Sequence, residues 1–336
     1  MRSAMRTTGA GLVLACFACG RGVEPRQTRE EPAAAPASDL VPQAEPAAPE
    51  RTVAFTFDDL PLARVGAHGP ERMQDVTTRL LGQLRGAGIV AVGFVNEAKL
   101  DKDGERPART ALLEQWLDAG MELGNHTYAH VSLWNTPLQE YQRQVLRGER
   151  VTRALLAERG QKPRYFRHPY LNTGPDLPTK EAFERFLAEH GYQVAPVTVD
   201  NLDVTYALAY DNAYQQADSA LMRRIGGAYV EHMRDSFAFS EELSRRVLDR
   251  EPAQVLMLHA NALNADYLDE LVAMLKQRGY RFVPTEHALR DPAYRSRDTY
   301  TGRRGLSWLQ RWAITQGEEP GREPREVEWV RKVAYP

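Results

Sequence analysis

The stretch AFTFDDLP (residues 54–61) ends an apolar segment of the chain with two adjacent carboxylates. Bulky apolar residues alternate with small ones over 53–57, and this period of two predicts a buried or half-buried strand. Pro61 ends the strand, because proline has no N–H to donate to a sheet. The neighbouring charges of Asp58 and Asp59 repel each other, so solvent, a cation or a proton must offset them. The residues alone leave two interpretations open, a solvated turn and a functional site at a strand end.

Strand-like and helix-like stretches alternate along the chain. The expected strands are Val53–Phe57, Ile89–Val95, Glu122–Asn125, Tyr165–Arg167, Val194–Val199, Val255–Leu258 and Arg281–Val283. The expected helices are Glu71–Arg85, Arg109–Ala119, Leu138–Glu158, Thr179–His190, Asp218–Leu248 and Asp266–Arg278. Seven alternations within about 240 residues favour a parallel α/β barrel or an open doubly wound sheet. In either architecture, reactive side chains gather at the carboxyl ends of the strands.

The first twenty residues have the layout of a secretory signal. Arg2 and Arg6 precede an apolar run over 10–18, which is too short to span a bilayer as a stable helix. Small residues precede Cys16 and Cys19, an arrangement that resembles a bacterial lipoprotein signal whose cysteine becomes lipidated. The alternative is ordinary signal cleavage near Cys19. We therefore expect an exported, periplasmic or cell-envelope protein, for which an N-terminal lipid on Cys16 or Cys19 is the one candidate means of membrane attachment.

Composition limits what the rest of the chain can be. Residues 21–50 are rich in Pro, Ala and Glu and poor in aliphatics, which predicts a disordered tether before a domain that begins near Arg51. The two cysteines of the chain lie in the signal segment, so the domain has no disulfide, thiolate zinc ligand or cysteine nucleophile. The formal charge of −2, without a dense basic patch, argues against nucleic-acid binding.

Two histidines with metal-ligand spacing follow the third expected strand. In GNHTYAH, His126 and His130 are four residues apart, and on a helical turn this spacing points both imidazoles the same way. The motif differs from the HExxH of zinc proteases, since Thr127 occupies the glutamate position. Two ordinary surface histidines are the alternative. Loops after strands one and three of a parallel sheet open on the same side, so Asp58 or Asp59 can supply a third ligand.

Other strand ends also carry groups that could act in catalysis. Arg167 follows the fourth strand, Asp200 and Asp203 follow the fifth, and His259 ends the sixth. Taken singly, Arg167 could form a surface ion pair and His259 could be a histidine at the edge of the core. Five strand ends that each bear Asp, Arg or His together favour a functional site.

Taken together, the motifs at the strand ends resemble those of a known family. The motifs TFDD, HTYAH, RHPY, DNLD and LMLH, in this order, are similar to the five motifs of the NodB-homology polysaccharide deacetylases, carbohydrate esterase family 4. The resemblance covers about Val53 to Leu289 and implies a distorted (β/α)7 barrel. It implies four segments: a signal at 1–20, a tether at 21–50, a catalytic domain at 51–290, and a C-terminal extension at 291–336 that packs on the barrel.

The resemblance also implies a metal centre. Asp59, His126 and His130 would hold Zn²⁺ or another divalent cation such as Co²⁺, Ni²⁺ or Mn²⁺. Three protein ligands leave an open position at which a cation can polarise a carbonyl and activate water.

The resemblance further implies catalytic roles in a hydrolysis for five residues. Asp58 would be the base, with Arg167 holding it ionised. The backbone N–H of Tyr170 would help to form an oxyanion hole. His259 would be the general acid, since an amine leaves poorly until it is protonated, and Asp203 or Asp200 would raise the pKa of His259.

The expected function is removal of N-acetyl groups from an amino-sugar polymer or oligosaccharide, of the chitooligosaccharide or peptidoglycan type, with release of acetate. The alternatives are an O-acetyl esterase of the xylan type and a catalytically silent glycan-binding lipoprotein. Val204 stands where relatives usually carry a tryptophan in the substrate groove, so substrate identity is less defined than reaction type. In the extension, Trp308 and Trp312 have helical spacing that favours packing on the barrel over stacking on a sugar.

Overall fold

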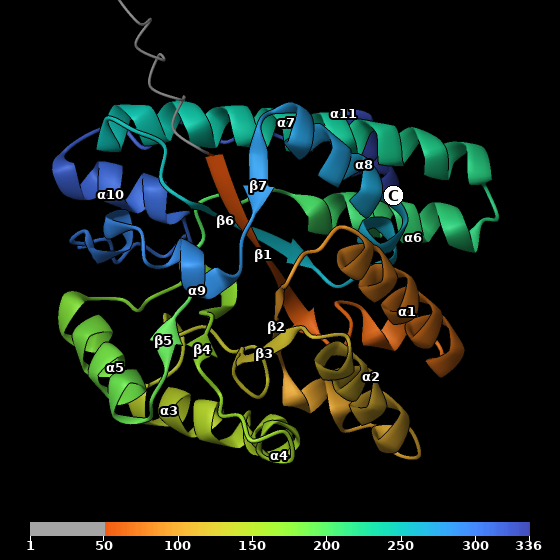
Figure 1. Ribbon diagram of the computed structural model, residues 1–336, viewed down its shortest axis with the longest axis horizontal. Helices are drawn as coiled ribbons and strands as arrows, with labels where there is room; N and C mark the ends of the chain where they lie inside the picture. Colours follow the sequence, from red (N-terminus) through yellow and green to blue (C-terminus); the bar gives the residue numbers. More distant parts are fainter. Residues whose placement is uncertain (1–50) are drawn as a thin grey trace, which may run out of the picture. The chain divides into compact units, whose positions relative to one another are not determined.

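Seven parallel strands form the centre of the structure, a computed structural model that describes residues 51–336. The expected signal segment (1–20) and tether (21–50) lie outside the described residues. The strands are β1 (Arg51–Leu60), β2 (Val92–Val95), β3 (Glu122–Asn125), β4 (Tyr165–Phe166), β5 (Gln193–Val194), β6 (Gln254–His259) and β7 (Tyr280–Phe282). They are arranged in the order β5-β4-β3-β2-β1-β6, and β7 pairs with the start of β1 (Figure 1).

The sheet curls back on itself to form a distorted barrel. Beyond β5, Val199 forms a parallel bridge with Leu256 of β6, so the segment after β5 joins the two ends of the strand order. Met257 N donates to Val199 O at 3.2 Å across this junction. The α/β barrel expected from the resemblance is confirmed, with β7 paired to β1 alone.

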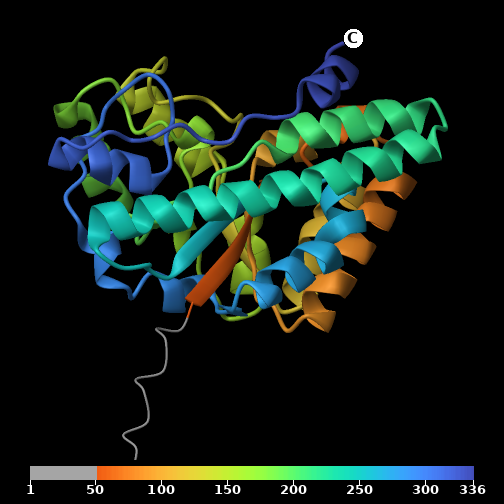
Figure 2. The same cartoon turned by 90° about the horizontal axis from the view of Figure 1, so that it is seen from above.

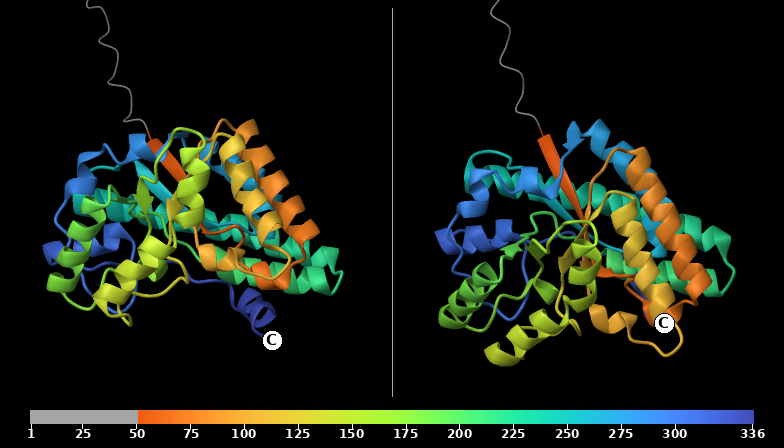
Figure 3. Two further views of the ribbon diagram at one scale, coloured as in Figure 1. Left: turned by 90° about the horizontal axis from the view of Figure 1, so that it is seen from below. Right: turned by 60° about the horizontal axis from the view of Figure 1, so that its bottom comes forward.

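Helices cover the outside of the sheet. Their bounds are α1 (Pro70–Gly86), α2 (Arg106–Asp118), α3 (Leu138–Arg147), α4 (Arg150–Ala157), α5 (Leu177–Glu189), α6 (Asp203–Gln215), α7 (Ser219–Leu248), α8 (Ala262–Gln277), α9 (Thr285–Ala288), α10 (Trp308–Gln316) and α11 (Glu328–Ala334). The long helix α7 contacts α6, α8 and α10, and α1 lies between α2 and α8 (Figures 2 and 3). No helix within 51–336 is long and apolar enough to cross a membrane.

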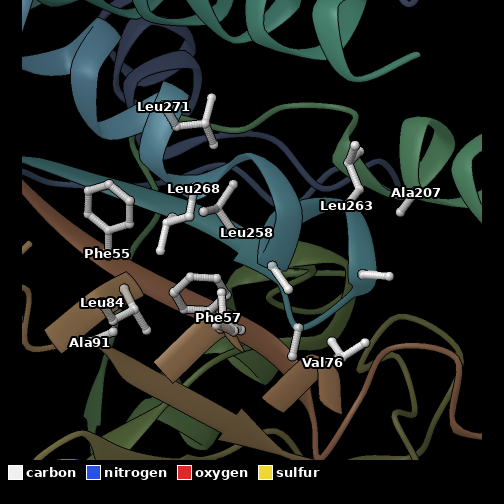
Figure 4. Packing of buried hydrophobic residues seen from close by; sticks show 14 of the residues in the cluster. Phe55, Phe57, Val76, Leu84, Ala91, Ala207, Leu258, Leu263, Leu268 and Leu271 are labelled. Atoms are coloured by element: carbon white, nitrogen blue, oxygen red, sulfur yellow. The ribbon is translucent and has the colours of Figure 1, made fainter. Parts of the chain in front are cut away.

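The largest buried cluster fills the space between β1, β6 and these helices. Phe55 and Phe57 project from β1 toward Leu258 of β6 and Leu268 of α8 (Figure 4). The ring of Phe57 also meets Trp116 of α2 edge to face, with centroids 5.5 Å apart. Burial of these large side chains fixes β1, and therefore the acidic residues at its end, in the middle of the fold.

One expected helix is divided in two. The stretch Leu138–Glu158 forms α3 and α4, separated at Gly148. A Cβ atom at Gly148 would lie 2.5 Å from the backbone nitrogen of Tyr128, so this point of the chain packs directly on the loop that carries the histidines. The close approach needs glycine, and the helix ends there.

Two further expectations were wrong in detail. The fifth strand was expected over Val194–Val199, but β5 ends at Val194, and Pro196 in this segment has no N–H for a ladder. Helix α6 was not anticipated, so Asp203 opens a helix and does not extend a strand.

The C-terminal residues pack closely on the barrel. Trp308 and Trp312 of α10 lie in a buried cluster with Leu171, Val197 and Leu243. Helix α11 packs on α6 through a separate contact. Residues after 290 therefore contribute side chains to the buried interior.

Candidate metal and catalytic site

The site lies where β1, β3, β4 and β6 end. In the register of β1 and β6, Asp58 pairs with His259, so these two side chains start from neighbouring strands. His126 follows the last residue of β3, and Arg167 follows the last residue of β4. All four positions are at carboxyl ends of parallel strands, as the alternation of strands and helices predicts.

Asp59, His126 and His130 converge on one point. Their ligand atoms lie within 4.8 Å of one another. Asp59 Oδ1 is 4.0 Å from His126 Nε2 and 3.6 Å from His130 Nε2. Asp59 and His130 have φ angles of 73° and 53°, a left-handed backbone that non-glycine residues adopt rarely. Such strain clusters at functional sites, where the surrounding structure holds it in place.

The imidazole of His126 is fixed in the form that binds a metal. It is buried, and its Nδ1 donates to the backbone carbonyl of Arg167 at 2.8 Å. This hydrogen bond leaves Nε2 as the atom that faces Asp59. Burial lowers the pKa of His126 to about 3, and burial together with His126 lowers the pKa of His130 to about 4. Both rings are therefore neutral near pH 7, with a lone pair free for a cation.

Asp59 is held by a lysine that the sequence analysis did not single out. Lys99 Nζ lies 3.2 Å from Asp59 Oδ1 and donates to the backbone carbonyls of Asp59 and Ala63 at 3.0 and 3.3 Å. Burial works to raise the pKa of Asp59, but Lys99 and His130 hold it below the ordinary range of an Asp. Lys99 lies in η2 (Glu97–Leu100), just after β2. Its position directly after a strand was the sequence feature that could have identified it as a site residue.

These residues fit a divalent cation. Asp59 Oδ1 is buried, and the ammonium of Lys99 is its one ion-pair partner other than the two histidines among the described residues, so this carboxylate oxygen keeps a lone pair for a cation. A cation bound at about 2.0–2.2 Å from each ligand would hold the ligand atoms roughly 3–4 Å apart, close to the distances observed here. Two neutral imidazoles and one carboxylate are also a ligand set that zinc commonly takes in catalytic sites.

Asp58 is a buried carboxylate paired with a buried guanidinium. Arg167 Nη1 lies 3.1 Å from Asp58 Oδ1, and Arg167 Nη2 donates to Thr56 Oγ1 at 2.9 Å. Arg167 Nε donates to the carbonyl of Ala195 at 2.8 Å. Burial raises the pKa of Asp58, while Arg167 counteracts this increase. His126 Nε2 is 3.8 Å from Asp58 Oδ2, so this carboxylate borders the cation cluster.

His259 is paired with Asp203. Its Nδ1 lies 2.8 Å from Asp203 Oδ1, and its backbone N–H donates to Asp203 Oδ2 at 2.8 Å. Asn264 Nδ2 also donates to Asp203 Oδ2, at 2.8 Å. Burial alone would lower the pKa of His259, but the Asp203 carboxylate raises it to about 9. The imidazole is therefore protonated at neutral pH.

Asp200, the alternative partner of His259, lies in a different environment. Its Oδ1 accepts from the backbone N–H of Asn201 at 2.7 Å. Burial and the nearby carboxyl of Glu323 raise the pKa of Asp200 to about 7. Of the two candidate acids, only Asp203 hydrogen bonds to His259 within the described residues.

Tyr170 lies at the open side of the cluster. It belongs to η3 (Pro169–Leu171) and has a φ of 58°, followed by Leu171 at 51°. Its side chain is 62% exposed, and its ring meets that of His130 with centroids 4.5 Å apart. The oxyanion role of its backbone N–H remains a prediction.

A model of the polysaccharide deacetylase family matches residues 45–195. This agrees with the resemblance inferred from the five motifs. The matched segment contains both aspartates, both histidines and the arginine of the site, whereas Asp203 and His259 lie beyond it.

A curated relative and solved structures are also similar to this chain. The peptidoglycan-N-acetylglucosamine deacetylase of Bacillus cereus is 24% identical over 236 residues, which cover 69% of this chain and 66% of that protein. A family 4 carbohydrate esterase from Streptomyces lividans in complex with acetate is 18% identical, with a TM-score of 0.43 over 71% of this chain and 95% of its own. A CE4 family pseudoenzyme from Bacillus anthracis is 16% identical, with a TM-score of 0.45 over 72% of this chain and 66% of its own. At these identities, function has to be argued from the residues of this chain.

Proposed function

From the match of residues 45–195 to the polysaccharide deacetylase model and from the geometry of the site, we propose that the protein is a metal-dependent amidohydrolase of that family. It would remove N-acetyl groups from an amino-sugar polymer or oligosaccharide, of the chitooligosaccharide or peptidoglycan type. In the reaction, water adds to the acetyl carbonyl, the C–N bond breaks, and acetate and a free amine are released. The N-terminal sequence supports export to the cell envelope, with lipidation at Cys16 or Cys19.

A divalent cation held by Asp59, His126 and His130 would polarise the acetyl carbonyl and lower the pKa of water. Asp58, which borders this cluster, accepts the proton of the attacking water, and Arg167 orients its carboxylate. The backbone N–H of Tyr170 stabilises the charge that develops on the carbonyl oxygen.

His259 protonates the departing nitrogen. Asp203 keeps the imidazole charged and fixes Nδ1, so Nε2 is the atom that delivers the proton. An amine needs this proton more than an alkoxide does, since the amine anion is the poorer leaving group. The raised pKa of His259 therefore favours an amide substrate over an O-acetyl ester.

The observation that carries the proposal is the convergence of Asp59, His126 and His130 beside Asp58. The test is acetate release from chitooligosaccharides, peptidoglycan and acetylxylan by protein stripped with a chelator and reloaded with Zn²⁺. We expect release from the N-acetylated glycans only after reloading. Asp58→Asn should abolish release and still bind Zn²⁺, and an active Asp58→Asn enzyme would disprove the assignment of the base. A catalytically silent glycan-binding protein would release no acetate under any condition.

The choice between amide and ester has its own test. His259→Ala should slow amide hydrolysis at least about 100-fold, because general acid catalysis typically contributes 10²–10⁴-fold. Hydrolysis of an activated acetyl ester should fall much less. Equal losses on both substrates would contradict the acid role of His259.

A further inference from the structure

A cavity of about 440 Å³ opens directly beside the cation cluster. The predicted metal ligand His130 forms one wall, and the aromatic side chains of Trp134 and Tyr170 form others. Ser132 and Asn135 add polar groups to the lining. Aromatic faces together with hydroxyl and amide groups are suited to a sugar unit that neighbours the one at the cation.

Among the described residues, Arg303 is the only lysine or arginine that lines this cavity, and no carboxylate lines it. Its guanidinium has no hydrogen-bond or ion-pair partner among the residues of 51–336. The next residue, Arg304, differs in this respect, because it is paired with Glu323 at 3.2 Å. The wall of the cavity therefore carries a positive charge that nothing in the described chain offsets.

The backbone around Arg303 is anchored to the loop that carries Tyr170. The buried Asn172 donates from Nδ2 to the carbonyls of Arg303 at 2.9 Å and Gly302 at 3.4 Å. A Cβ at Gly305 would lie 1.7 Å from the carbonyl oxygen of Tyr170, so the two segments are in direct backbone contact there. The backbone of Arg303 is thus fixed at the wall of the cavity, and its exposed side chain lines the cavity, although the residue comes from the C-terminal extension.

We propose that this cavity is a subsite for a carboxylate-bearing sugar unit, recognised by Arg303, so that the substrate is an anionic N-acetylated glycan. The inference rests on the deacetylase function proposed above. The planar guanidinium binds a carboxylate through two parallel hydrogen bonds, which gives both affinity and geometric selectivity. The carboxylate could belong to a uronic acid or to the lactyl ether of a muramic acid.

Three oligosaccharides distinguish these sources. The neutral reference is tetra-N-acetylchitotetraose. The first acidic probe alternates N-acetylglucosamine with glucuronate, and the second is a peptide-free peptidoglycan tetrasaccharide with lactyl carboxylates. The kcat/KM for acetate release is measured for each with the Zn²⁺-loaded enzyme, at low and high salt. The wild type should favour one acidic probe over the neutral one, and high salt should weaken this preference.

Four proteins are compared: the wild type, Arg303→Gln, Arg303→Lys and the control Arg85→Gln. The control alters an exposed arginine of α1 that forms no ion pair within residues 51–336 and lies outside the cavity. Arg303→Gln should lower kcat/KM on the preferred acidic probe by about tenfold, as expected for a charge-assisted hydrogen bond at a solvated site. The kcat/KM of Arg303→Gln on the neutral probe should stay within about twofold of the wild-type value, because that probe has no carboxylate for Arg303 to bind. Arg303→Lys should recover part of the loss, and Arg85→Gln should match the wild type.

Equal losses on neutral and acidic probes would mean that Arg303 only supports the wall, and unchanged values would mean that it contacts no substrate. Either result overturns the inference. Binding of the three probes to wild type and Arg303→Gln is measured in parallel by calorimetry. If the wild type releases no acetate from any probe, the proposed function fails, while a carboxylate-dependent difference in binding would still support the subsite.

Discussion

Asp58 and His259 lie opposite each other in the parallel register of β1 and β6. The predicted base and the predicted acid of the reaction are therefore positioned by adjacent strands of the central sheet and not by two independent loops. Each has its own partner, Arg167 for Asp58 and Asp203 for His259. Burial raises the pKa of Asp58 against the effect of Arg167, and the Asp203 carboxylate raises the pKa of His259 against the effect of burial.

The cation cluster predicts one Zn²⁺ site within residues 51–336. His126→Ala removes a buried ligand that a hydrogen bond to the backbone carbonyl of Arg167 holds in position. The dissociation constant for Zn²⁺ should therefore rise by more than about 100-fold. Calorimetric titration of chelator-stripped protein measures this change. His287→Ala, an exposed histidine of α9, is the matched control and should bind Zn²⁺ like the wild type. Equal affinities in the two variants would place the cation elsewhere.

The pair of His259 and Asp203 predicts a pKa of about 9 for the imidazole in the metal-free protein. Asp203→Asn removes the charge that raises it, so the pKa should fall to about 6.5 or below. Titration of the imidazole signals by NMR measures the shift, and Asp200→Asn, which alters the acid that does not hydrogen bond to His259, is the control. A pKa that stays near 9 in Asp203→Asn would contradict the assignment.

The same pair has a consequence for stability. The pKa of His259 is higher in the folded protein than the value of 6.5 for a free side chain, so folding favours the protonated ring. The contribution of the pair is therefore complete below about pH 6.5 and is lost as the pH rises through about 9. Asp203→Asn should lower the Tm at pH 6 more than at pH 10, and a pH-independent difference would show that packing alone is affected.

Arg167→Met should destabilise the protein strongly. The substitution leaves the Asp58 carboxylate buried without a guanidinium partner and removes the hydrogen bonds that Arg167 donates to Thr56 and Ala195. Breaking a buried ion pair in this way costs about 3–5 kcal/mol. Urea unfolding at pH 7 measures the free energy of unfolding. Arg164→Met is the control, because Arg164 forms its ion pairs with Glu122 and Glu286 at the surface, where such pairs contribute little. Similar losses in the free energy of unfolding in both variants would show that burial of the Asp58 carboxylate does not require the Arg167 guanidinium.

Gly148→Ala tests why the long helix is interrupted. The added Cβ would meet the backbone of Tyr128, which cannot move without disturbing the loop of His126 and His130, so we expect a loss of about 1–3 kcal/mol. Gly82→Ala within α1 meets nothing within 4 Å and should stabilise the protein by about 0.5–1 kcal/mol. Chemical unfolding of both variants gives the comparison, and a neutral Gly148→Ala would refute the close approach.

Much of the fold could be predicted because its signals are local. The apolar alternation before Asp58 is confirmed as the central strand, and Glu122–Asn125 is confirmed as β3 residue for residue. The division of the expected long helix was missed because a distant contact overrides the local pattern. Gly148 ends a helix because of Tyr128, twenty residues earlier, and the periodicity of the stretch contains no sign of this contact.

The candidate site likewise contains residues that the sequence could identify and others that it could not. The sequence supplied the histidine pair, the aspartate pair and the strand ends that carry Arg167 and His259. It could not choose between Asp200 and Asp203, since both follow the fifth strand and only the start of α6 directs Asp203 to the imidazole. Lys99 was missed because a lone lysine after a strand has no distinctive local pattern.

By itself, the sequence determined the order of the strands and helices and the chemical groups at the strand ends, because hydrophobic periodicity and residue type act over a few neighbouring residues. Only the tertiary structure decided which groups meet: Lys99 with Asp59, Asp203 with His259, and Arg303 with the cavity beside His130. These contacts join residues that are 40 to 173 positions apart in the chain. Such encounters depend on how the whole barrel packs, which no short stretch of residues specifies.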